Sequence, residues 1–166
     1  HSANLHRQFQ TFVKVPAGTS VTKVAAGANS DDYHWTDVMM KIAGKHMDAL
    51  SVHYYTVPGG WPPRASSFEF DEAGWIETLS SALKIDEILR KHIEVMDKHD
   101  PENKVALYLD EWGTWYKVEE GTNPGFLYQQ NTMRDAVVAA SLLNIFNNHS
   151  DRVRMTNIAQ IVNVLQ

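Results

Sequence analysis

One stretch of the sequence decides the fold: Val105-Ala106-Leu107-Tyr108-Leu109-Asp110-Glu111-Trp112-Gly113-Thr114-Trp115-Tyr116. Residues 105–110 form a short, mostly apolar run, which predicts a buried strand. Two carboxylates and two tryptophans lie at and just beyond the end of this strand. In folds built on parallel strands, functional groups gather where the strands end. The stretch therefore predicts a strand and a candidate site together.

Working outward, strands and helices alternate along the chain. Alternation of this kind indicates a parallel α/β sheet with crossover helices, and we expect its strands in sequential order. Four strands could form an open sheet, but half of an eight-stranded (β/α)8 TIM barrel fits the pattern equally well. A strand order with a reversal would instead indicate a nucleotide-binding fold. The expected strands are 21–28, 49–56, 105–110 and 156–165, and the expected helices are 3–13, 35–47, 71–97 with a break near the middle, and 128–147.

Composition excludes several classes of protein. The 166 residues carry a formal net charge of −5, whereas a nucleic-acid binder needs a basic surface. No apolar run approaches the ~20 residues of a membrane span, and the absence of cysteine excludes disulfides and thiolate metal sites. The histidines show no metal-ligand spacing, and His92 and His99 are expected on a solvent-facing helix with neighbouring lysines. The clustered aromatic residues could be core, or the walls of a cleft that binds sugars.

Polar residues mark the predicted strand ends. Glu111 is a candidate nucleophile or general base, although a strand-end carboxylate can also cap the next element or pair with a basic group. Alternation along 49–56 puts His53 and Tyr55 on one face of the sheet and Tyr54 on the other. His53 and Tyr55 could therefore orient the carboxylate, or could simply pack in the core.

Four segments together resemble glycoside hydrolase family 51, the α-L-arabinofuranosidases, in the family's order and spacing. They are 50–55 (LSVHYY), 109–116 (LDEWGTWY), 123–135 (NPGFLYQQNTMRD) and 157–164 (NIAQIVNV). The resemblance implies a TIM-barrel catalytic domain accompanied by a β-sandwich domain. It also implies a retaining, exo-acting enzyme that releases terminal α-L-arabinofuranosyl units from arabinan- or arabinoxylan-type saccharides.

The same resemblance implies roles for individual residues. Glu111 matches the family's nucleophile, and Tyr55 matches a tyrosine that hydrogen-bonds near it. Trp115 matches an indole of the sugar pocket, Gln160 matches a sugar-contacting glutamine, and His53 is expected beside the substrate. No cofactor and no metal are implied.

The family's acid/base glutamate has no counterpart in the chain. The resemblance thus implies that residues 1–166 are the C-terminal half of the barrel, strands about five to eight, without the N-terminal half and the β-sandwich. We expect this half alone to be inactive, and the other half to lie in the parent chain or in another chain.

Two rival functions stay open: a retaining TIM-barrel glycosidase for another sugar, and a non-catalytic carbohydrate-binding or assembly fragment. The expected partners are arabinose-containing oligo- or polysaccharides and further copies in a homo-oligomer, with no nucleic acid and no membrane. The family resemblance implies a cytoplasmic location.

Overall fold

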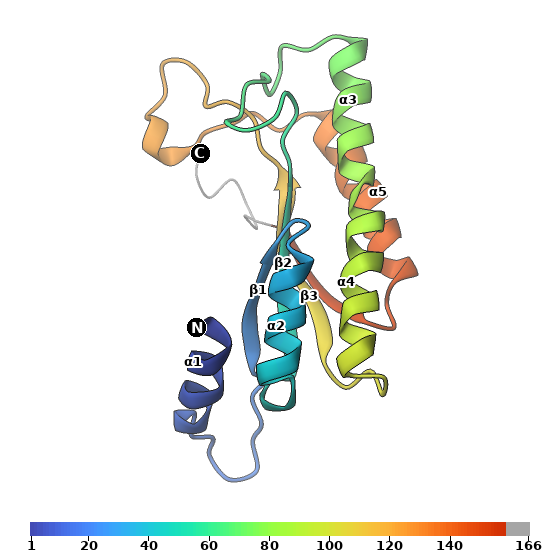
Figure 1. Cartoon of the computed structure of the whole chain (residues 1–166). Coiled ribbons are helices and arrows are strands. Elements are labelled where there is room, and N and C mark those ends of the chain that lie inside the picture. Colours follow the sequence, from blue (N-terminus) through green and yellow to red (C-terminus); the bar gives the residue numbers. More distant parts are fainter. Residues whose placement is uncertain (159–166) are drawn as a thin grey trace.

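Four parallel strands form one sheet in the computed structural model, which describes residues 1–158 (Figure 1). The strands are β1 (Val24–Asn29), β2 (Ala49–Thr56), β3 (Ala106–Thr114) and β4 (Val153–Ile158). Their order in the sheet is β1-β2-β3-β4, and each pair of neighbours is parallel. The predicted parallel α/β sheet and its sequential strand order are confirmed, and a reversal in the middle is excluded for these four strands.

Helices separate the strands, as the alternation predicted. They are α1 (Ser2–Phe9), α2 (Tyr33–Ala43), α3 (Glu72–Leu83), α4 (Ile85–His99) and α5 (Met133–Asn148), with 3-10 turns at Gln10–Phe12, Gly44–His46 and Pro124–Phe126. The long helix expected over 71–97 is indeed broken, at Lys84, into α3 and α4. In Figure 1 these two helices follow one another in line alongside α5.

Several predicted boundaries are wrong. Helix α5 begins at Met133 and not at Tyr128, because Thr132 and Asp135 form a capping box that satisfies free backbone N–H groups at the helix start. Strand β4 begins at Val153, three residues before the predicted strand. The remainder of that predicted strand, beyond Ile158, lies outside the described residues.

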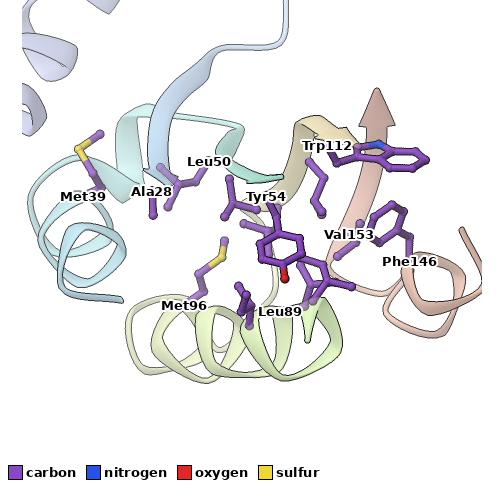
Figure 2. Close-up of a cluster of buried hydrophobic side chains, with 14 of the residues drawn as sticks. Ala28, Met39, Leu50, Tyr54, Leu89, Met96, Trp112, Phe146 and Val153 are labelled. Atoms are coloured by element: carbon purple, nitrogen blue, oxygen red, sulfur yellow. The ribbon is translucent and has the colours of Figure 1, made fainter. Parts of the chain in front are cut away.

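The core lies between the sheet and the helices that cover it. Leu50, Val52, Leu107 and Leu109 are fully buried in the two central strands. Figure 2 shows side chains of α4 and α5 packing against those of the strands, with Tyr54 pointing toward the α3–α4 helices. The Tyr54 hydroxyl donates to the Ser81 carbonyl of α3 at 2.5 Å, which fixes that helix against β2.

His92 contradicts the expectation of a solvent-facing histidine. It is completely buried in α4, where its ring nitrogens lie 2.8 Å from the Thr36 hydroxyl and 2.7 Å from the Ser30 carbonyl. Burial lowers the pKa of His92, although the hydrogen bond to Ser30 opposes that shift. The neighbouring Lys91 faces outward, while His92 continues the inward face formed by Ile88 and Leu89.

Candidate active site

A bulge in β3 brings two consecutive carboxylates to one face of the sheet. Ser51 of β2 pairs with Tyr108, but His53 pairs with Glu111, so β3 has one residue more than β2 over this interval. Bulges re-aim side chains in this way and are frequent beside active sites. In a regular strand Asp110 and Glu111 would face opposite sides of the sheet. Here both carboxylates reach the same histidine on β2.

His53 lies between the two carboxylates. Its Nε2 is 3.0 Å from Asp110 Oδ1, and its Nδ1 is 3.5 Å from Glu111 Oε2. The side chains of His53 and Asp110 are about one-third exposed and that of Glu111 is about half exposed. All three side chains are therefore partly exposed, and each carboxylate contacts the histidine.

Tyr55 donates a hydrogen bond from its hydroxyl to Glu111 Oε2 at 3.2 Å. The predicted placement of this hydroxyl, on the neighbouring strand and within reach of the carboxylate, is confirmed. Burial, followed by the charge and the hydrogen bond of Glu111, raises the pKa of Tyr55 to about 12. Tyr55 is therefore a protonated donor to Glu111 throughout the neutral and mildly alkaline range.

Two indoles extend the site beyond Tyr55. The Trp115 ring meets the Tyr55 ring edge-on at 5.0 Å between centroids, and the Trp61 ring meets Trp115 in the same manner at 5.4 Å. Edge-to-face pairs at these separations are favourable aromatic contacts. An aromatic series thus runs from the Glu111 carboxylate outward to Trp61, which is 68% exposed.

The backbone around Trp115 is fixed on both sides. The Trp115 N–H donates to the Thr56 carbonyl at 2.9 Å. The Gln129 side chain accepts from the Tyr116 N–H and donates to the Thr114 carbonyl, each at 3.0 Å. One glutamine amide therefore holds the two residues that flank Trp115.

A second set of contacts anchors the same connection to the start of α5. Asp135 accepts hydrogen bonds from the hydroxyls of Thr114 at 2.5 Å and Tyr116 at 2.9 Å. The Arg134 guanidinium is fully buried between the rings of Tyr116 and Phe70, at 4.4 and 3.7 Å from their centroids. Arg134 also donates to the Ser66 and Ser67 carbonyls. These contacts give the loop after β3 a defined shape.

Sequence reasoning did not single out Gln129, Arg134 or Asp135. For Asp135 a signal was present, since Thr132 followed by an acidic residue three positions later is a capping-box pattern. The contacts of Gln129 and Arg134 depend on tertiary structure and had no such pattern.

Three of the predicted site residues line one open cleft of about 650 Å³. Glu111, Tyr55 and Trp115 line it, together with Tyr128 and Gln129 from the connection before α5. His53 contacts Glu111 directly. Gln160, the remaining predicted site residue, lies outside the described residues. The structure thus brings four of the predicted residues together.

Two structural findings limit the kinds of site present. Among residues 1–158 no group of three or more His, Asp or Glu side chains is arranged to hold a metal ion. Within the same part of the chain, no helix has the length and hydrophobicity to span a membrane.

The carboxylate with its tyrosine donor thus lies in an aromatic cleft toward the carboxyl ends of parallel strands, where α/β proteins carry their functional sites. Residues 110–166 match the family model described as "Alpha-L-arabinofuranosidase C-terminal domain". The crystal structure of the GH51 arabinofuranosidase from Xanthomonas axonopodis pv. citri is 62% identical, with a TM-score of 0.97 over 99% of this chain and 34% of that one.

Curated relatives agree with this match. The intracellular exo-α-L-arabinofuranosidase of Bacteroides ovatus is 48% identical over 99% of this chain and 32% of its own length. The intracellular exo-α-(1→5)-L-arabinofuranosidase of Halalkalibacterium halodurans is 26% identical over 91% of this chain and 29% of its own length.

The chain thus spans about a third of the length of the relatives it matches. Together the matches show that it is similar to a segment of the α-L-arabinofuranosidases, among them a GH51 enzyme of known crystal structure.

Proposed function

We propose that the parent protein of this chain is a retaining, exo-acting α-L-arabinofuranosidase and that Glu111 is its nucleophile. The observation that carries the proposal is the hydrogen bond from Tyr55 to Glu111, made between neighbouring strands where they end in an aromatic cleft. Such a donor orients one carboxylate oxygen and leaves the other free to react. The similarity to arabinofuranosidases over 99% of the chain supports the choice of sugar.

In the proposed reaction, a Glu111 oxygen attacks the anomeric carbon while the bond to the leaving oxygen breaks. A second carboxylic acid gives its proton to that oxygen, and the sugar remains attached to Glu111 as an ester. The second group then takes a proton from water, whose oxygen displaces Glu111 and restores the original configuration. The acid/base group must lie roughly 5–5.5 Å from Glu111, and we assign it to a part of the parent outside this chain.

The other side chains have supporting roles in this scheme. Trp115 forms a wall of the pocket for the terminal sugar, and His53 binds the substrate beside Glu111. We also assign Gln160 a sugar-binding role, as the family resemblance implies. No cofactor is needed for the chemistry.

We further propose that residues 1–166 are the C-terminal half of a TIM-barrel catalytic domain, strands about five to eight. The sequential parallel order of the strands supports this, as does the match to only about a third of each much longer relative. The remaining barrel half, arabinose-containing saccharides and further copies of the protein are its proposed partners. A cytoplasmic location is proposed because the names of the curated relatives include the word intracellular.

The test compares Glu111→Gln with wild type in the full-length parent, on an aryl α-L-arabinofuranoside and on an arabino-oligosaccharide. We expect turnover to fall by about 10³-fold or more with unchanged folding, because the amide keeps the shape and lacks the nucleophilic charge. Glu120→Gln is the matched control, since Glu120 is an exposed glutamate on the connection that follows β3. NMR of the first-formed sugar should show the α anomer.

The outcomes separate the rival functions. Near-normal turnover by Glu111→Gln, or a β product, would refute the assigned nucleophile or the retaining mechanism. Cleavage of another glycoside in preference to arabinofuranosides would support a glycosidase for a different sugar. Sugar binding by the wild-type parent without any turnover would support a carbohydrate-binding protein.

A further inference from the structure

We propose that Asp110 is a positioning residue for Glu111, which acts through His53 by fixing the orientation of the imidazole ring beside the Glu111 carboxylate. The inference rests on the proposed role of Glu111 as the nucleophile and gives a role to the second carboxylate of the site. The geometry that points to it is a series of two contacts. Asp110 Oδ1 lies 3.0 Å from His53 Nε2, and His53 Nδ1 lies 3.5 Å from Glu111 Oε2.

The His53 ring depends on these contacts for its orientation. Its side chain is about one-third exposed, and within residues 1–158 its polar contacts are those with the two carboxylates. An imidazole can rotate by half a turn about its last side-chain bond, which exchanges nitrogen and carbon positions with little change of shape. A partner on one nitrogen removes this freedom and determines where the ring proton lies. Asp110 is the nearer of the two carboxylates, so it is the group that fixes the ring.

Asp110 is suited to this role because its Oδ1 atom has no competing partner. This oxygen is shielded from solvent, and in the described part of the chain it accepts no hydrogen bond from any other residue. A shielded carboxylate oxygen without a nearby donor costs free energy. The His53 Nε2–H group, at 3.0 Å, is the donor that offsets this cost. Asp110 and His53 therefore form one unit.

The bulge in β3 makes the contact between Asp110 and His53 possible. The interval from Tyr108 to Glu111 lies opposite only the interval from Ser51 to His53. With regular alternation, Asp110 and Glu111 would point to opposite faces of the sheet. A bulge disrupts the ladder of backbone hydrogen bonds, and in return it re-aims a side chain. The side chain that is re-aimed here is a second carboxylate beside the first.

The consequence is that one oxygen of Glu111 is held from two directions. The Tyr55 hydroxyl and His53 Nδ1 both approach Oε2, at 3.2 and 3.5 Å. Among the described residues neither of these two groups contacts Oε1, so that oxygen is the one directed at the sugar. Loss of the Asp110 contact would free the ring, leave Tyr55 alone on Oε2 and let the carboxylate turn away from the line of attack.

The test is a double-mutant cycle in the full-length parent, with Asp110→Ala, His53→Ala and the double variant. Asp110→Asn is added, because asparagine keeps a side-chain oxygen that can accept from His53. Asp37→Asn is the matched control, since Asp37 contacts His99 at 2.8 Å between α2 and α4 and does not line the cleft. The measurements are kcat and KM on an arabino-oligosaccharide and inhibition by L-arabinose. Urea unfolding checks each variant, and Asp110→Leu, which also lacks an acceptor, replaces Asp110→Ala if that variant does not fold.

For Asp110→Ala we expect kcat to fall about 10- to 100-fold, as for a misplaced reacting group, while KM and inhibition by L-arabinose change less than about threefold. Asp110→Asn should recover most of kcat. In the His53→Ala background, Asp110→Ala should change kcat less than about twofold, because its effect passes through the ring. Asp37→Asn should behave like wild type.

Other results overturn the inference. Unchanged kcat in Asp110→Ala, or losses that multiply in the double variant, would show that Asp110 does not act through His53. Equal losses for Asp110→Asn and Asp110→Ala would show that the charge of Asp110 is needed and not its acceptor oxygen. A raised KM with unchanged kcat would show that the pair serves sugar binding alone.

Two outcomes concern the proposed function as well. Restored turnover of Asp110→Ala on addition of azide would identify Asp110 as the acid/base group, since azide takes the place of the activated water. A wild-type parent that cleaves no arabinofuranoside would refute the proposed function, and this inference with it. Normal turnover by wild type and loss of turnover in Glu111→Gln, with no effect of Asp110→Ala, would refute the role of Asp110 alone.

Discussion

Replacing Gln129 by methionine should weaken both the fold and the sugar pocket, because one side chain holds the backbone on both sides of Trp115. Methionine has a similar length and cannot form the hydrogen bonds to the Tyr116 N–H and the Thr114 carbonyl. Each bond contributes about 0.5–1.5 kcal/mol net. The free energy of unfolding should therefore fall by about 1–3 kcal/mol. A less well-held Trp115 should weaken inhibition by L-arabinose about 3- to 10-fold.

The assay combines urea unfolding with inhibition by L-arabinose, both in the full-length parent. Gln130→Met is the matched control, since the exposed Gln130 side chain contacts only near neighbours in the chain: it donates to the Asn131 carbonyl at 3.1 Å and accepts from the Tyr128 hydroxyl at 3.4 Å. The reasoning is refuted if Gln129→Met and Gln130→Met are equally stable and bind L-arabinose equally well. A loss of stability with unchanged binding of L-arabinose would show that the Gln129 side chain holds the connection after β3 without orienting the Trp115 indole.

Two further predictions concern ionisation and a buried charge. The free energy of unfolding should fall as the pH rises from 10 to 12. Tyrosines in the unfolded chain lose their protons near pH 10, whereas burial keeps three tyrosines of the folded chain protonated. Absorbance at 295 nm should show that these three tyrosines ionise at a higher pH in the folded protein than in the unfolded one. Burial raises the pKa of Tyr54 and that of Tyr55 to about 12, and raises the pKa of Tyr116 still further. Arg134→Lys should lower the free energy of unfolding by about 2–4 kcal/mol, because an ammonium cannot reproduce the planar fit between two rings. Urea unfolding would compare the free energy of unfolding of Arg134→Lys with that of Arg90→Lys, a control at an exposed arginine. Equal values for the two variants would contradict the role given to Arg134.

The strands were predictable because their signal is local. Apolar runs of strand length between helical patterns identified β2 and β3, and alternation along β2 separated Tyr54 from Tyr55. Alternation also explains why the Tyr55–Glu111 contact could be anticipated without coordinates. The predicted positions of strand ends and helix starts were less accurate, since these boundaries depend on capping residues and on pairing with neighbouring strands.

The bulge in β3 was not predictable, because a bulge is an excess of residues relative to a partner strand and exists only in a known register. Without it, the contact of both Asp110 and Glu111 with His53 could not be foreseen. His92 is a different case, because its signal was present. It continues the inward face of α4, which is formed by Ile85, Ile88, Leu89 and Met96. The sequence reasoning gave more weight to the adjacent lysine than to this helical period.

Strand β2 shows why the site and the core depend on one register. Tyr54 donates to the Ser81 carbonyl on the helix side, and Tyr55 donates to Glu111 on the cleft side. A slip of one residue would exchange the faces of both tyrosines, losing two hydrogen bonds and placing a buried ring in the cleft. Packing of Tyr54 against α3 therefore also determines where Tyr55 meets Glu111. The core residues that fix the register of β2 thus position the carboxylate, although they lie on the opposite face of the sheet.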